Sequence, residues 1–193
     1  MDIGAQNEWE NETFRSIHLL EDDLSNKSFE DCNFIDCEFT ECAWNGASFM
    51  NCEFKNCSLE NLKINNCKLS DVLFEECKLV GLNFSICKKL LFSIKLKNSN
   101  VLLCNFSGLK LEDTSFSGST IKDCDFLEAN LSGADFSKCD LQGSLFENCD
   151  LRQTDFRGAV NYAIDPWQNK VKKAKFSMPE VLSLLTPFDL VIE

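Results

Sequence analysis

A large apolar residue recurs at every fifth position through most of this chain. Thirteen such centres run without a miss from Leu24 to Phe84. After the segment Cys87 to Leu91, the period resumes two residues out of phase, with 14 further centres from Leu91 to Phe156. A helix repeats its apolar residues about every 3.6 positions and a strand about every second one, so neither explains a period of five.

A coil that turns a corner after every five residues has this period. In each short extended side, the centre and the residue two before it point inward, because alternate residues face the same way. The other three residues form the outer face and the corner, where Asn, Asp, Ser and Gly are suited to turns. Four sides give a coil of about 20 residues, and successive coils stack about 4.8 Å apart through parallel hydrogen bonds. The period therefore predicts an all-β solenoid.

The second run of centres also predicts a filled interior. From Phe106 to Phe156 they alternate between Phe and Leu or Ile. On a four-sided coil, this alternation places phenylalanine stacks on two opposite walls. The rings would fill the interior at the density that protein cores require, leaving no room for a substrate.

All 12 cysteines occupy one column of the five-residue repeat, the inward-facing small position. A zinc site needs two closing pairs of ligands, but here the spacing recurs at a constant period and the skipped positions hold Ala47, Leu62, Val72 and Leu82. A disulfide scaffold is disfavoured because the opening "MDIGAQNEWENE" is polar and has no signal-peptide character. We therefore expect buried structural thiols, no metal, no cofactor and a cytoplasmic location.

The chain divides into three parts. Residues 1–13 read as a polar tail, residues 14–160 as the solenoid with a phase slip at 87–91, and residues 161–193 as a C-terminal cap and dimerisation segment. In the last part, Pro166 occupies a centre position, and Val171 and Phe176 recover the phase.

A short helix is expected from about 178 to 185. Ser177 and Glu180 have capping-box spacing, and Pro187 should end the helix, because the residue before a proline is pushed out of helical geometry. The final "FDLVIE" is expected to be an apolar strand.

Segments such as "CNFID", "CEFKN", "CDFLE", "ADFSK" and "TDFRG" resemble the repeat of the pentapeptide-repeat proteins, A/C-D/N-L/F-polar-polar. The resemblance covers roughly residues 14–160. It implies a right-handed quadrilateral β-helix with a short C-terminal helix.

The C-terminal segment is more apolar than a solvated tail. An open solenoid end must be covered, either by an intramolecular cap or by a partner. The ending also resembles that of pentapeptide-repeat proteins that pair through their C-termini, so we expect a homodimer. Its contact residues would be Val181, Leu182, Leu185, Phe188, Leu190, Val191 and Ile192.

The net charge of −12 is concentrated in the first half, where residues 1–87 hold 17 acidic and 6 basic side chains. Such a surface repels nucleic acid and anionic membranes and favours a basic protein partner. The alternative is that the charge only keeps the rod soluble. We name the predicted partner-binding surface the acidic wall: Glu30, Asp31, Asp36, Glu38, Glu41, Glu53, Glu60, Asp71, Glu75 and Glu76.

No catalytic motif is present in the sequence, so an enzyme is not expected. The resemblance to Qnr-type members implies a DNA-mimicking protein that binds DNA gyrase or topoisomerase IV and protects it from quinolones. This chain lacks the long projecting loops of those members, which places the drug protection in doubt more than the contact with gyrase. The alternative is an acidic scaffold with an unrelated protein partner.

Overall fold

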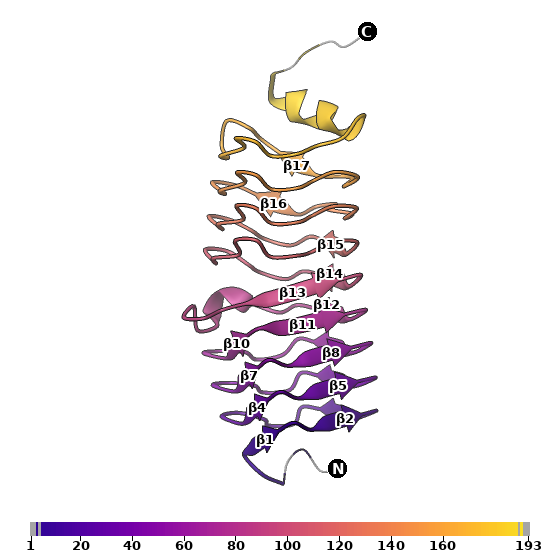
Figure 1. The fold of residues 1–193 in the computed structure, drawn as a ribbon, viewed down its shortest axis with the longest axis vertical. Coiled ribbons are helices and arrows are strands. Elements are labelled where there is room, and N and C mark those ends of the chain that lie inside the picture. Colours follow the sequence, from indigo (N-terminus) through magenta and orange to yellow (C-terminus); the bar gives the residue numbers. More distant parts are fainter. Residues whose placement is uncertain (1–2, 4, 189, 191–193) are drawn as a thin grey trace.

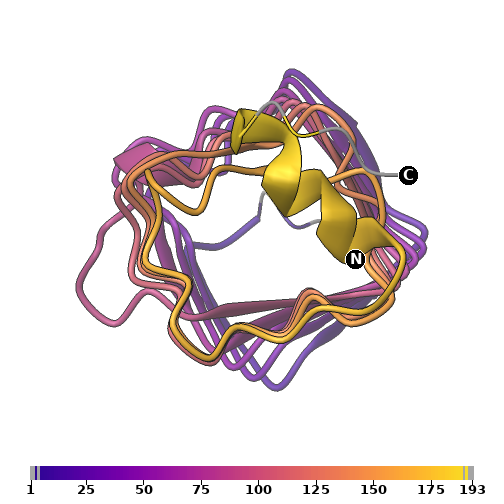
Figure 2. The same cartoon turned by 90° about the horizontal axis from the view of Figure 1, so that it is seen from above.

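The chain winds upward as a solenoid of about 8 stacked coils (Figure 1). The computed structural model describes residue 3, residues 5–188 and residue 190. Seen along its axis, the coils superpose as a four-cornered ring (Figure 2). The predicted all-β solenoid with a short C-terminal helix is confirmed.

Four walls run along the axis, and we number them in the order in which the chain meets them. Wall 1 contains β1 (Glu8–Glu10), β4 (Ser28–Glu30), β7 (Ser48–Met50) and β10 (Lys68–Ser70). Wall 2 contains β2 (Thr13–Arg15), β5 (Asn33–Ile35), β8 (Glu53–Lys55), β11 (Val72–Glu75) and β13 (Ile94–Lys97). Wall 3 contains β3 (His18–Leu20), β6 (Glu38–Thr40), β9 (Ser58–Glu60), β12 (Lys78–Val80), β14 (Asn100–Leu102) and β15 (Thr120–Lys122). Wall 4 consists mainly of single bridges, with β16 (Leu145–Phe146) and β17 (Ala163–Ile164) near the top.

Neighbouring strands in each wall are parallel and one coil apart. Trp9 of β1 lies in register with Phe29 of β4, a step of 20 residues. Across the phase slip, Val72 of β11 pairs with Ile94 of β13, a step of 22. The chain also contains two 3-10 helices. η1 (Phe84–Ile86) precedes the phase slip, and η2 (Glu180–Phe188) follows the last coil.

Phenylalanine rings form stacks through much of the interior, with Leu96 between Phe74 and Phe116 on wall 2. On wall 2, Phe116 and Phe136 stack with centroids 4.5 Å apart, and on wall 4, Phe106 and Phe126 stack at 5.0 Å. The two stacks meet edge to face across the core, as Phe126 does with Phe136 at 5.7 Å. Both geometries are favourable for aromatic pairs. The predicted stacks on opposite walls are confirmed.

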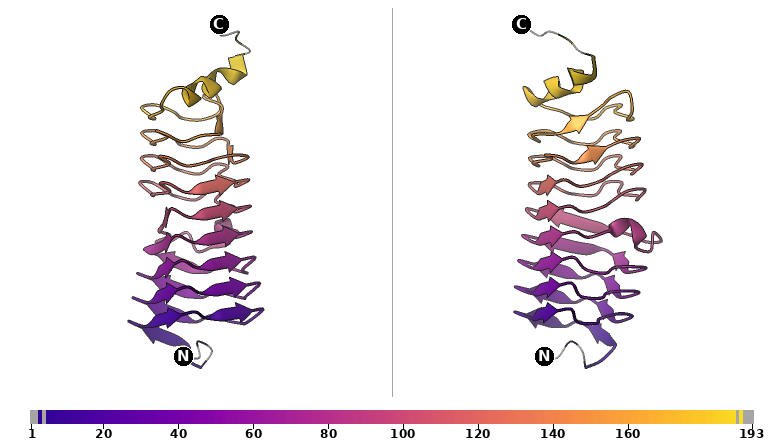
Figure 3. Two further views of the ribbon diagram at one scale, coloured as in Figure 1. Left: turned by 90° about the vertical axis from the view of Figure 1, so that its right-hand side faces the viewer. Right: turned by 180° about the vertical axis from the view of Figure 1, so that it is seen from behind.

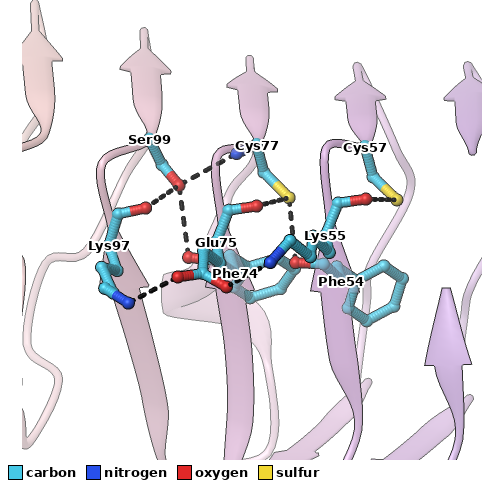
Figure 4. Close-up of polar contacts among 8 residues, drawn as sticks. All are labelled: Phe54, Lys55, Cys57, Phe74, Glu75, Cys77, Lys97 and Ser99. Atoms are coloured by element: carbon cyan, nitrogen blue, oxygen red, sulfur yellow. Dashed lines mark hydrogen bonds and ion pairs between the residues drawn. The ribbon is translucent and has the colours of Figure 1, made fainter. Parts of the chain in front are cut away.

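All 12 cysteines are buried and unpaired, as expected for structural thiols. The Cys57 thiol donates to the Phe34 carbonyl one coil below at 3.3 Å, and the Cys77 thiol does the same to Phe54 at 3.2 Å. Ser99 continues this column, with its hydroxyl donating to the Phe74 carbonyl at 3.2 Å (Figure 4). The column is therefore a ladder of small hydrogen-bonding side chains.

Corners are built in two ways, and the residue before the centre distinguishes them. In the upper half, residues 100–176, the Ser137 N–H donates to Asp135 Oδ1 at 2.8 Å. The next corner residue, Lys138, has a φ of 59°, and the Cys139 N–H donates to the Phe136 carbonyl at 3.2 Å. This is a closed β-turn that the aspartate stabilises from the side. The same side-chain bond is made by Asn105, Asp125, Asn130, Asp140, Asp150 and Asp155.

In the lower half, residues 8–87, most corners between walls 1, 2 and 3 stay open. The residue before the centre is mainly Ser, Glu or Lys, and the strand continues one residue past the centre. A corner residue in the left-handed region then turns the chain, as Asp31 does with a φ of 53°. Strand arrows are accordingly frequent in the lower coils and sparse in the upper ones (Figure 3).

The phase slip forms a projecting turn after η1, visible in Figure 2 as the loop outside the ring. The Phe92 N–H closes this turn on the Lys89 carbonyl at 3.5 Å. Leu91 was predicted as a buried centre, and this prediction is wrong: it is 66% exposed, and Leu90 is 80% exposed. Two extra residues do not fit into a five-residue side, so the turn carries both leucines outward, and Phe92 packs against the core instead. Lys88 and Lys89, which precede the turn, are exposed.

The last coil differs from its prediction on wall 4. Ile164 lies in register with Phe146 and is 2% exposed, so it fills the centre that we assigned to Pro166. The register step there is 18 residues, because two residues are missing before β17. The step returns to 20 at Lys170, which bridges to Asp150, so the phase does recover at Val171 and Phe176.

η2 lies across the open end of the last coil (Figure 2). Leu184 packs against the core, while Val181 and Leu185 are half-buried. The expected capping box is absent: Ser177 Oγ instead accepts from the Gly158 N–H at 2.8 Å, which ties the helix start to the coil below. The helix also continues past residue 185 through Pro187, which lies in the last turn, where its missing N–H removes only one bond.

Candidate partner-binding surface

The acidic wall extends over three walls of the lower half. Its middle members lie on wall 2 and on the corner after that wall: Asp36, Glu53, Glu75 and Glu76. Glu30, Asp31 and Asp71 lie on wall 1 and the corner after it. Glu38, Glu60 and Glu41 lie on wall 3 and the corner after it.

Three of these carboxylates are engaged in ion pairs. Glu75 lies between Lys55 and Lys97, with Lys55 Nζ 3.1 Å away (Figure 4). Hydrogen bonds from Lys97 and Lys55 lower the pKa of Glu75. Because its side chain is only 14% exposed, Glu75 is poorly placed for a partner.

The other two pairs lie on wall 3. Glu60 pairs with Lys78 at 2.8 Å, and this bond together with that from Ser58 lowers the pKa of Glu60. Glu38 accepts from His18 Nδ1 at 3.0 Å, but both side chains are more than half exposed, so this contact is readily broken.

Seven acidic-wall residues form no ion pair with a described residue. Asp36 accepts from Asn56 Nδ2 at 2.7 Å, and Asp71 accepts from Ser93 Oγ at 3.2 Å. Neutral hydrogen bonds of this kind orient a carboxylate without cancelling its charge. The unpaired set is Glu30, Asp31, Asp36, Glu41, Glu53, Asp71 and Glu76.

Aspartates of the upper half have a different role. Asp150 and Asp155 bind the N–H of the residue two positions on, and their side chains are only 12% and 14% exposed. Arg152 and Arg157 cover them with two-pronged contacts, and the hydrogen bond from Arg157 lowers the pKa of Asp155 to about 2. These carboxylates serve the corners and offer little negative charge to a partner.

A basic cluster at the top of walls 1 and 2 was missed by the sequence reasoning. Its members are exposed on the last two coils: Arg152, Arg157, Lys170, Lys172, Lys173 and Lys175. The signal was present as the run "KVKKAK" after the last regular repeat. The rod is therefore acidic along its lower half and locally basic at its upper end.

The expected dimerisation residues lie on or after η2. Leu182 and Phe188 are each 40% exposed, and Leu190 is 58% exposed. Phe188 belongs to η2 rather than to a final strand, and its ring lies 5.7 Å from that of Trp167. Trp167 itself is 76% exposed, so an apolar surface is available at this end. Val191 and Ile192 lie outside the described residues.

No helix in the described part of the chain is long and apolar enough to cross a bilayer. The interior is packed with side chains, and the surface hollows are shallow. One of them, lined by Asp36, Glu38, Asn56, Glu76 and Lys78, lies at the corner between walls 2 and 3. It belongs to the acidic wall.

Known structures share this architecture. A trypsin-treated form of QnrB1, described as a plasmid-mediated fluoroquinolone resistance protein, superposes with a TM-score of 0.64 at 19% identity, covering 96% of this chain and 97% of that one. A second trypsin-treated form gives a TM-score of 0.61 at 20% identity, covering 96% and 91%. The full-length protein gives 0.58 at 14% identity, covering 92% and 100%. At these identities the likeness shows the fold alone.

The comparison with curated proteins found no match. The family model described as "Pentapeptide repeat region" matches three overlapping segments, residues 7–84, 27–102 and 99–176. These segments span the whole solenoid, so the chain belongs to the pentapeptide-repeat family.

Proposed function

We propose that this protein is a non-enzymatic DNA mimic that binds a type II topoisomerase, DNA gyrase or topoisomerase IV. The observation that carries the proposal is the set of seven unpaired carboxylates on the lower half. They point away from a rod whose packed interior offers no substrate site. A basic groove that normally grips phosphates would attract such a surface.

Dimensions support the same partner. About 8 coils at about 4.8 Å each make an arm of about 38 Å. Two arms joined at their upper ends would measure about 75 Å, roughly the length of 22 base pairs at 3.4 Å each. The unpaired carboxylates would then lie on the outer half of each arm, and the basic clusters would lie near the junction of the two arms.

The rod is proposed to be a homodimer joined through η2 and the residues after it, because Leu182, Phe188 and Trp167 leave apolar surface at that end. Light scattering of the intact chain should report about 44 kDa, twice the 21.9 kDa chain mass. The double variant Leu182→Asp/Phe188→Asp should be a monomer, whereas Leu20→Asp, a change at an exposed leucine of the first coil, should leave the dimer intact. A clean monomer of the unmodified chain would rule out this assembly.

Protection of the enzyme from quinolones is a further part of the proposal. It is supported by the fold shared with a fluoroquinolone resistance protein. We place the protein in the cytoplasm, where its 12 buried thiols would stay reduced.

A supercoiling assay with purified gyrase tests the central claim. The wild-type chain should inhibit supercoiling or relieve inhibition by a quinolone. The variant Glu30→Gln/Asp31→Asn/Asp71→Asn/Glu76→Gln removes four unpaired charges and should be at least tenfold less effective. The effect should also weaken steeply with salt, as electrostatic association does.

A matched control removes four exposed charges from the upper half: Asp113→Asn/Asp123→Asn/Glu128→Gln/Glu147→Gln. It changes the net charge by the same amount and should act within about twofold of the wild type. Equal loss in both variants would show that only net charge matters. If the wild type neither inhibits nor protects, mimicry should be abandoned for the second candidate, an acidic scaffold that binds an unrelated basic protein.

A further inference from the structure

In the first coil, three strand edges have no partner strand among the described residues. β1, β2 and β3 are each the terminal strand of their sheet. Among the described residues before β1, none pairs with these strands, although Ile3 is 4% exposed and packs against the core. Ile3 therefore covers part of the bottom of the interior, and the described residues before β1 leave the backbone edges open. Such an edge is a template for another strand.

Charge on this coil is almost entirely negative. Residues 8–23 hold six acidic side chains and one arginine. On wall 1, Glu10 lies directly below Glu30, so two like charges are neighbours, and neither forms an ion pair with a described residue. A shallow hollow lined by Glu8, Trp9, Glu10, Ser28 and Glu30 lies at this place.

In several ion pairs elsewhere in the solenoid, the basic side chain lies about one coil away from the acidic one. Lys55 and Lys97 reach Glu75 from the coils below and above, and Lys175 reaches Asp155 at 3.6 Å. Glu8 and Glu10 have no such partner among the described residues. The position that would supply one is the coil that would lie below them.

A second copy of the chain does not fit this position well. Its first coil would bring acid against acid. Its last coil has the right side chains, since Lys170 and Lys172 end the same wall that Glu8 and Glu10 begin. However, η2 lies across that end and blocks the approach (Figure 2). The open edge is thus protected against self-stacking while it stays available to another chain.

We propose that the first coil is a docking edge for an extended strand of another protein, one that carries lysine or arginine on its outward-facing positions. The strand would hydrogen-bond to β1 and continue round the corner to β2, and its basic side chains would lie against Glu8, Glu10 and Glu30. This edge shares Glu30 with the acidic wall, whereas Glu8 and Glu10 belong to the edge alone.

The last coil of this chain supplies a probe of the required chemistry. A fluorescently labelled peptide with the sequence of residues 168–176, "QNKVKKAKF", would place the equivalents of Lys170 and Lys172 below Glu8 and Glu10. Fluorescence anisotropy should show saturable binding to the full-length protein. A peptide of the same charge with proline in place of its valine and alanine should bind at least tenfold more weakly, because proline lacks the N–H that a strand donates.

Two protein variants locate the site. Glu8→Gln/Glu10→Gln should weaken peptide binding about tenfold, whereas Glu128→Gln/Glu147→Gln, on the upper half, should leave it unchanged. Hydrogen exchange should slow at β1 and β2 on binding but not at β15. Absence of binding, equal binding of the proline peptide, or equal loss in both variants would each overturn the proposal.

Discussion

The lower and upper halves of the solenoid have the same five-residue repeat, but their acidic residues occupy different positions in it and have different roles. In the upper half, Asp135 and its equivalents precede the centre and bind a backbone N–H at the corner. In the lower half, that position holds mainly Ser, Glu or Lys, and most corners between walls 1, 2 and 3 stay open. A short carboxylate can reach the N–H two residues on, whereas glutamate is one methylene longer and projects outward.

This difference separates structural acid from acid that is free to bind. Asp150 and Asp155 are held by the corner and covered by arginine, so each is less than 15% exposed. Glu30 and Glu76 lie at exposed positions without an ion-pair partner among the described residues. A count of acidic residues alone does not separate these two kinds of carboxylate. The residue before the centre is the better guide to where a basic partner would bind.

The largest effect should come from the core, which the two halves share. Phe34→Ala on the lower wall 2 stack and Phe136→Ala on the upper one should each lower the free energy of unfolding by about 3–5 kcal/mol. Both rings are almost fully buried and stack with neighbours on the coils below and above. Urea unfolding monitored by circular dichroism measures the change. A cost confined to one half would show that the halves unfold separately.

Cysteine replacement should be the next largest effect. Cys52→Ala in the lower half and Cys139→Ala in the upper half should each cost about 1–2 kcal/mol, because a sulfur-sized volume and a hydrogen bond to a carbonyl are lost. Burial raises the pKa of both thiols to about 12.

Iodoacetamide at pH 8 should consequently label the folded protein slowly and the urea-unfolded protein at all 12 cysteines. Purified protein should contain no stoichiometric zinc. Zinc that is released on alkylation would contradict the structural interpretation of these thiols.

Much of the fold could be predicted because the repeat encodes it position by position. The centres, the small inward column and the opposed phenylalanine stacks follow from the period and from alternation in an extended side. The errors occur where the period breaks. Leu91 and Pro166 were assigned as centres by counting in steps of five. The insertion at Leu91 forms a turn, and the deletion before Pro166 shifts the register. A five-residue period predicts neither outcome.

Predicting the candidate surface was partly possible. Position in the coil placed the ten acidic-wall residues on their walls. It did not show that Glu75 lies between two lysines, because this contact depends on which long side chains meet across coils 20 and 22 residues apart. The pairing register therefore decides which charges are free.

A test of the closed corners comes next. Asn105→Ala removes the acceptor of the Ser107 N–H at 2.8 Å and should cost about 1 kcal/mol. Asn33→Ala changes the same kind of residue at an open corner of the lower half, where its side chain makes no hydrogen bond with a described residue. It should cost less than about 0.5 kcal/mol. Equal costs in urea unfolding would remove the distinction between the two kinds of corner.

Acid should weaken the upper half through Asp155. Its folded pKa of about 2 lies below the ordinary value of 3.8, so its contribution to stability is present above about pH 4. This contribution is lost as pH falls through about 2, because the folded state must then accept a proton. Asp155→Asn keeps an acceptor for the Arg157 N–H but not the charge, so its stability should vary less between pH 4 and 2. Arg157→Gln should likewise reduce the change in the free energy of unfolding between pH 4 and 2. If this pH dependence is the same in both variants as in the wild type, the assignment to Asp155 is contradicted.

The smallest effect should come from the turn that separates the halves. Deleting Leu90 and Leu91 removes two exposed side chains and restores the 20-residue step between β11 and β13, in place of the present 22. No buried contact of either leucine is lost, and Leu91 no longer has to hold a φ of 60°. The free energy of unfolding should therefore change by less than about 1 kcal/mol, with the same circular dichroism spectrum. If the shortened chain unfolds, or melts in two steps, the two halves are separate solenoids that the turn joins, and they do not share one continuous core.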